Sequence, residues 1–176
     1  MRTALAALLI LALAPADARA QEKDVARFGC HSDASDADLE RLRQRPELRE
    51  VHVLSSKITD AGMEHFHFLP KLEVLDLNTD SITDKGLEKI GTLEKVKTLN
   101  LARLPLTAAG YAPLKSMPSL RKLHLMRMAI TPEVVDQLKQ LTKLETLSFS
   151  QLHGESLPNA QGLGALLPGV KVAIYR

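Results

Sequence analysis

Three residues of this 176-residue chain have the types found in a hydrolytic site, namely His52, Asp76 and Ser148. An imidazole held by a carboxylate can take the proton from a serine hydroxyl, which then attacks a carbonyl carbon. Such a mechanism requires the three side chains to lie within hydrogen-bond reach of one another. The elements that carry them therefore decide whether they can react together.

Those elements follow from a unit of 24 residues that recurs along the chain. Within a unit, apolar and polar residues first alternate, which predicts a strand buried on one face, and apolar residues are then spaced by three, which predicts a helical turn. Each unit is thus strand, turn and helix. The apolar positions of the first unit, each repeated 24 residues later, are Leu48, Val51, Val53, Ile58, Met63, Phe66 and Leu69.

Turn and cap residues repeat with the same period. Threonines stand where each helix should begin, and their hydroxyls can accept from the free N–H groups of the first turn. Glycines follow three residues later, where a side chain would obstruct a neighbouring coil or a tight first turn. The threonines are Thr59, Thr83, Thr107 and Thr131, and the glycines are Gly62, Gly86 and Gly110.

The repeat separates the three residues of the hydrolytic hypothesis. Successive units place His52 and Asp76 on neighbouring strands, where they can form a hydrogen-bonded pair, but Ser148 lies three strands beyond Asp76, about 14 Å away. A triad is therefore excluded, and a single His–Asp pair is more often structural than catalytic. No glycine-rich phosphate loop or metal-spaced cluster is present, so we expect neither an enzyme nor a cofactor or metal.

The N-terminal residues 1–20 have the features of a secretory signal peptide. Arg2 precedes an apolar run from Ala4 to Ala14, and Ala18-Arg19-Ala20 is typical of a cleavage site. Retention of this segment as an anchor is the alternative, but we expect the mature chain to be extracytoplasmic, either periplasmic or secreted, and not inserted in a membrane. A formal net charge of only +2 gives no electrostatic argument for nucleic acid as a partner.

The repeat also divides the chain. Residues 21–47 are expected to form an N-terminal cap containing the latter half of a unit, residues 48–143 four repeats, and residues 144–176 a divergent repeat with a C-terminal cap. The last strand, Val170 to Tyr175, should place Ala173 and Tyr175 in the core. Cys30 is the only cysteine, so we expect no internal disulfide. We expect it to be partly buried in the cap, with an intermolecular disulfide as the alternative.

The second unit carries the sequence Leu72-Glu-Val-Leu75-Asp-Leu77 followed by Ile82-Thr83-Asp84-Lys85-Gly86-Leu87. It resembles the leucine-rich repeat family, and it is most similar to exported bacterial members and to the ribonuclease-inhibitor-like and cysteine-containing subfamilies. The resemblance implies an α/β solenoid, a right-handed coil with a concave parallel sheet and helices on the convex side. It also implies binding of proteins or peptides without chemistry of its own. The chain departs from the family at the position of the ladder asparagine, occupied here by Ser56, Asp80, Leu104 and Met128.

Strand side chains that point away from the core form columns across the concave sheet, and these are the candidate partner-binding residues. They form a polar stripe about 20 Å long, acidic in the first two units and basic in the next two, which would orient a partner. The alternative is that they are merely solvated strand positions. The candidates are His52, Asp76, Asn100, His124 and Ser148 in the central column, Glu50 and Lys122 before it, Asn78 and Met126 after it, and Arg103 and Arg127 at the strand exits.

No ligand pocket is evident in these columns, and a stripe suits an extended or convex partner better than a small molecule. The sequence therefore predicts an exported, non-enzymatic module that binds a protein or peptide on its concave sheet. The alternative is a structural or adhesive module that self-associates through an unpaired coil at one end. The divergent stretch from Ser150 to Gly162 would weaken that alternative if it capped the core.

Overall fold

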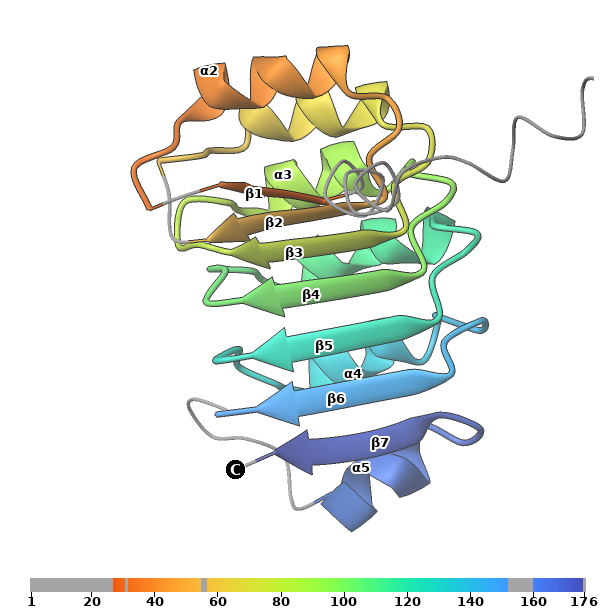
Figure 1. Cartoon of the computed structure of the whole chain (residues 1–176). Coiled ribbons are helices and arrows are strands. Elements are labelled where there is room, and N and C mark those ends of the chain that lie inside the picture. Colours follow the sequence, from red (N-terminus) through yellow and green to blue (C-terminus); the bar gives the residue numbers. More distant parts are fainter. Residues whose placement is uncertain (1–26, 31, 55–56, 152–159, 176) are drawn as a thin grey trace, which may run out of the picture.

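The structure, a computed structural model, describes residues 27–30, 32–54, 57–151 and 160–175 (Figure 1). The expected signal segment and most of the divergent stretch from Ser150 to Gly162 lie outside these residues. Among the described residues, no helix is long and apolar enough to cross a membrane.

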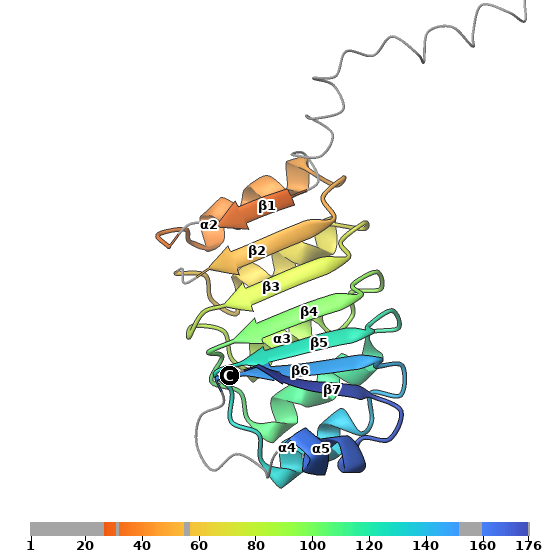
Figure 2. The ribbon, with the colours of Figure 1, turned by 60° about the horizontal axis from the view of Figure 1, so that its bottom comes forward.

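Seven parallel strands of the described chain form a single sheet in sequence order (Figure 1). The units are stacked one beside the next, and the helices all lie on the same side of the sheet, as Figures 1 and 2 show. This is the α/β solenoid that the alternating periods predict. The strands are β1 (Arg27–Cys30), β2 (Glu50–Leu54), β3 (Val74–Asn78), β4 (Thr98–Ala102), β5 (Lys122–Met126), β6 (Thr146–Ser150) and β7 (Lys171–Tyr175).

Short α and 3-10 helices return the chain from one strand to the next. Two of the threonines cap as expected, since the hydroxyl oxygens of Thr83 and Thr131 accept from backbone N–H groups of the first turn. The Thr59 hydroxyl instead accepts from the Ala61 N–H, which precedes the first residue of η2. The helices are α2 (Asp36–Leu39), η1 (Glu40–Gln44), η2 (Gly62–Phe68), α3 (Asp84–Ile90), η3 (Ala108–Ser116), α4 (Pro132–Leu138) and α5 (Ala160–Leu166).

A ladder of aspartates joins successive helix starts, which the sequence did not reveal. Asp84 at the start of α3 accepts from both the backbone N–H and the hydroxyl of Thr107 in the next unit, at 3.0 and 2.6 Å. Asp36 and Asp60 make the same pair of bonds to Thr59 and Thr83. Each recurring glycine lies against one of these carboxylates, so its missing side chain makes room for the previous unit.

The apolar positions of the repeat meet in one continuous core between sheet and helices. The prediction for the last strand was wrong. Phe149 pairs with Ile174 in the sheet register, and Ser150 with Tyr175, so Val172 and Ile174 face the core, whereas Ala173 and Tyr175 lie on the opposite face. A shift of one residue exchanges the two faces of a strand, and the offset from β6 to β7 is not the 24 residues of the other units.

The segment that was expected to form an N-terminal cap contains a strand that the repeat pattern does not predict. Residues Arg27 to Cys30 pair in parallel with Glu50 to Val53, so the described part of this segment has both a strand and a helix. Cys30 in this strand is free and buried. Burial raises the pKa of its thiol to about 11, with a further contribution from Asp38, so the thiol is neutral and unreactive at neutral pH.

Candidate functional site

The sheet face that carries no helices is the candidate site, and we call it the open face. The register places the predicted central column directly across five neighbouring strands, from His52 on β2 to Ser148 on β6. The flanking candidates Glu50, Asn78, Lys122 and Met126 lie on the same face, because side chains two residues apart point to the same side of a strand.

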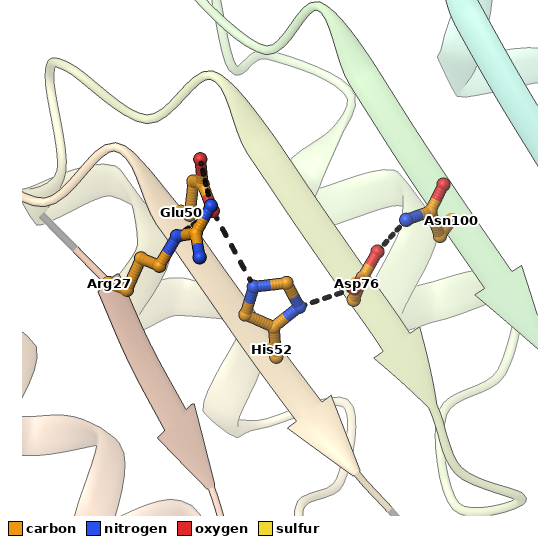
Figure 3. Close-up of polar contacts among 5 residues, drawn as sticks. All are labelled: Arg27, Glu50, His52, Asp76 and Asn100. Atoms are coloured by element: carbon orange, nitrogen blue, oxygen red, sulfur yellow. Dashed lines mark hydrogen bonds and ion pairs between the residues drawn. The ribbon is translucent and has the colours of Figure 1, made fainter.

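The acidic end of the open face is internally paired (Figure 3). The Asp76 carboxylate accepts from His52 Nδ1 on one side and from Asn100 Nδ2 on the other. Glu50 forms an ion pair with Arg27 at 2.5 Å and lies 3.9 Å from His52 Nε2. The predicted His52–Asp76 pair is therefore present, within a network that holds both carboxylates in place.

The basic part of the face is arranged differently. Arg103 and Arg127, which the repeat places at the strand exits, bond in opposite directions: Arg103 Nε donates to Asn78 Oδ1 in the preceding unit at 3.0 Å, and Arg127 Nε donates to the Gln151 side chain in the following unit at 2.6 Å. Both arginines have positive φ angles, 63° and 54°, which turn the chain out of β4 and β5. Lys122 is exposed. Since these cations are not neutralised by carboxylates within the described residues, the charge presented by this half of the face is positive.

His124 lies between two buried polar atoms that have no hydrogen-bond partner in the part of the chain that the structure describes. Asn100 Oδ1 and Ser148 Oγ, on the strands either side of His124, have no hydrogen-bond partner among the described residues. Ser148 was expected in a solvated stripe but is only 2% exposed, because its short side chain lies beside the longer His124. Burial lowers the pKa of His124, opposed by the Asp76 carboxylate and assisted by Lys122, so its ring is neutral at neutral pH.

The open face contains a hollow of about 370 Å³, which we call the Ala102 hollow. Its volume lies in the range of ligand pockets. No such hollow was expected from the columns of strand residues in the sequence. One row of its lining is polar and the other largely apolar. The lining side chains of the open face are Asp76, Asn100, His124 and Ser148 in the first row, and Leu54, Asn78, Ala102, Met126, Ser150 and Tyr175 in the second.

One sequence signal could have revealed the hollow. In the second row a small alanine, Ala102, stands between Asn78 and Met126 in the register. Ala102 is 5% exposed, whereas Leu54, Met126 and Tyr175 are 48%, 40% and 60% exposed. A short side chain among long ones leaves a depression at its position. Tyr175 joins the row only through the phase of β7, which could not be read from the repeat.

The hydrolytic hypothesis finds no support in this geometry. His52 bonds Asp76, but three strand spacings separate Asp76 from Ser148. Within the part of the chain that the structure describes, no group of three or more histidine, cysteine, aspartate or glutamate side chains could hold a metal ion. What the face offers is hydrogen bonding, positive charge and exposed apolar surface.

Comparison with known proteins supports the fold. No family model matches the sequence, and no curated protein matches it. Among solved structures, the chain is similar to an internalin from Listeria monocytogenes str. 4b F2365, with a TM-score of 0.52 and 18% sequence identity over 89% of this chain and 49% of the internalin. The chain thus spans about half the length of that protein. The likeness shows the fold, an α/β leucine-rich repeat solenoid, as the sequence predicts.

Proposed function

We propose that the chain is an exported, non-enzymatic module that binds a protein or peptide on its open face. The observation that carries this proposal is the Ala102 hollow, where exposed Leu54, Met126 and Tyr175 adjoin buried polar atoms that have no partner among the described residues. Exposed apolar side chains gathered in a depression with a polar border are typical of protein-binding surfaces.

The sequence features support export, since residues 1–20 have the composition of a signal peptide. The candidate binding residues are those of the open face around the hollow: Asn78, Asn100, Met126, His124 and Ser148, with Lys122, Arg103 and Arg127 supplying positive charge. His52, Asp76 and Glu50 hold one another in place and act mainly by positioning Asn100.

The test is capture of partners from the producer's extracytoplasmic extract by the immobilised chain. A double variant, Lys122→Glu with Met126→Glu, alters two exposed side chains of the open face. The control, Lys85→Glu with Leu166→Glu, makes the same kinds of change at exposed helix positions. A partner lost only with the first variant supports the open face as the site. Equal capture by both variants, or recovery of the chain itself alone, would place binding elsewhere or favour self-association.

A further inference from the structure

We propose that the Ala102 hollow receives a tyrosine side chain from a peptide segment of the partner. This inference rests on the proposed function and narrows it to the chemistry of one inserted side chain. Three properties of the hollow lead to it: its apolar wall, its buried polar atoms without partners among the described residues, and the charge around it.

The apolar wall favours an aromatic ring. Leu54, Met126 and Tyr175 are the large apolar side chains exposed at the hollow, and Ala102 leaves its floor low. A thioether makes favourable contacts with aromatic rings and adjusts to their shape, because methionine has three rotatable bonds. A second aromatic ring can pack against Tyr175 in an offset or edge-to-face arrangement. An aromatic guest beside Met126 on β5 can therefore use the methionine and, two strands away, the Tyr175 ring, while Leu54 on β2 extends the apolar surface beyond it.

The polar row favours a guest with a hydroxyl group. Asn100 donates its amide hydrogen to Asp76, which leaves Asn100 Oδ1 as an acceptor without a partner among the described residues. Ser148 Oγ, which can donate as well as accept, lies two strands away, with His124 between them. Buried polar atoms are nearly always hydrogen-bonded. A phenol can donate to the amide oxygen and accept from the serine, and half-buried His124 is the side chain that turns to admit it.

The surrounding charge disfavours a cationic guest. The carboxylate nearest the hollow, Asp76, is already bonded to His52 and Asn100. Lys122, Arg103 and Arg127 lie along the same strands and strand exits, and within the described residues they bond no carboxylate. A lysine or arginine would meet like charges there, whereas tyrosine brings an aromatic ring and a hydroxyl without charge.

The experiment titrates the 15N-labelled whole chain with three peptides and follows its amide signals by NMR. The probes are acetyl-Thr-Tyr-Thr-amide and the same peptide with phenylalanine or lysine in the centre. We expect the tyrosine peptide to shift the signals of Ala102, His124 and Met126 and to bind about five- to a hundredfold more tightly than the phenylalanine peptide, since the two hydrogen bonds of the phenol are at stake. Equal binding of the two, or tighter binding of the lysine peptide, would overturn the proposal.

Variants locate the guest. Ser148→Ala should lower the ratio of the phenylalanine to the tyrosine dissociation constant about three- to tenfold, because it removes one of the two hydrogen bonds of the phenol. Ala102→Leu should abolish binding by filling the hollow, whereas the control Thr98→Leu adds bulk on the same strand and face but outside the lining. Binding unaffected by Ala102→Leu contradicts the proposal.

Two further outcomes would also overturn it. A concentration-dependent dimer that Ala102→Leu abolishes would make a second copy of the chain the occupant. In the second outcome, no peptide shifts the amide signals of the residues that line the hollow, while the Lys122→Glu, Met126→Glu double variant still loses its captured partner. That outcome would contradict tyrosine as the guest but leave the proposed function in place.

Discussion

The side chain with the least expected environment is His124. It was predicted to be one member of a solvated stripe, but it lies between Asn100 and Ser148, two residues whose side chains have buried atoms without partners among the described residues. Desolvation of the ring is the largest influence on its pKa and lowers it, and Lys122 acts in the same direction. The neighbouring Asp76 opposes both but is engaged with His52 and Asn100. The sheet therefore favours the neutral ring.

This gives a pH dependence of known sign. The folded-state pKa of His124 lies below its ordinary value of 6.5, so the unfolded chain binds more protons as the pH falls below about 7, and acid lowers the free energy of unfolding. His124→Gln removes this contribution. Urea unfolding between pH 8 and pH 5 should show a smaller loss of stability in the variant.

At pH 8 the histidine is neutral in both states, so any difference there reports packing alone. Parallel stability curves for the wild type and the variant over the whole range would show that His124 is not desolvated.

At the level of elements, the aspartate ladder explains the Thr-Asp-x-Gly part of the repeat. A Cβ added at Gly110 would lie 2.0 Å from Asp84 Oδ1, which two hydrogen bonds to Thr107 hold in place. The next unit shows the converse. Ala108 replaces the aspartate there, and a buried valine, Val134, replaces the glycine. The glycine is thus required only where the preceding unit supplies a carboxylate.

Gly110→Ala should therefore destabilise the chain by roughly 1 to 3 kcal/mol, because the new methyl group displaces Asp84 from Thr107. In the double variant Asp84→Ala with Gly110→Ala the space is free, so its loss of stability should be smaller than the sum of the two single losses by about 1 kcal/mol or more. Chemical denaturation of the four proteins measures this coupling.

Gly164→Ala is the control, since a Cβ at this position in α5 meets nothing within 4 Å. It should be neutral or stabilise by about 0.5 to 1 kcal/mol through helix propensity. If the losses of stability in the Asp84 and Gly110 double-mutant cycle were additive, the requirement for glycine at position 110 would not come from the Asp84 carboxylate.

The same elements show how far the sequence leads. The strand positions of β2 to β6, their register and the His52–Asp76 pair follow from the 24-residue period, because a fixed period puts equivalent residues side by side. The period fails at the ends. β1 contributes only two apolar positions, Phe28 and Cys30, and pairs with β2 at an offset of 23 residues, while β7 pairs with β6 at an offset of 25. The Ala102 hollow depends on differences in side-chain length along one column, which a pattern of apolar and polar residues does not record.

In the whole molecule, the strands follow one another in sequence order, so the stability of each unit depends on the units packed directly beside it. Each inner strand has a strand on both sides, whereas β1 and β7 are the edges of the sheet within the described residues. Burial of the core side chains differs in the same way between inner and edge strands. Val51 on the inner strand β2 is 0% exposed, whereas Val172 and Ile174 on the edge strand β7 are only partly buried. In such arrays the end units are held by one interface only, and they open first.

A matched pair of valine substitutions tests this view. Val51→Ala removes two methyl groups from a closed site and should cost about 2 to 3 kcal/mol, from lost burial and the cavity that remains. Val172→Ala removes the same groups from a partly exposed site and should cost less than about 1 kcal/mol. Urea unfolding gives the two losses, and hydrogen exchange should show that amide protection in β7 is lower than in β3 to β5. Equal losses would mean that β7 is as firmly enclosed as an inner strand. The C-terminal edge would then be a finished cap, which would remove the unpaired end that self-association through this edge requires.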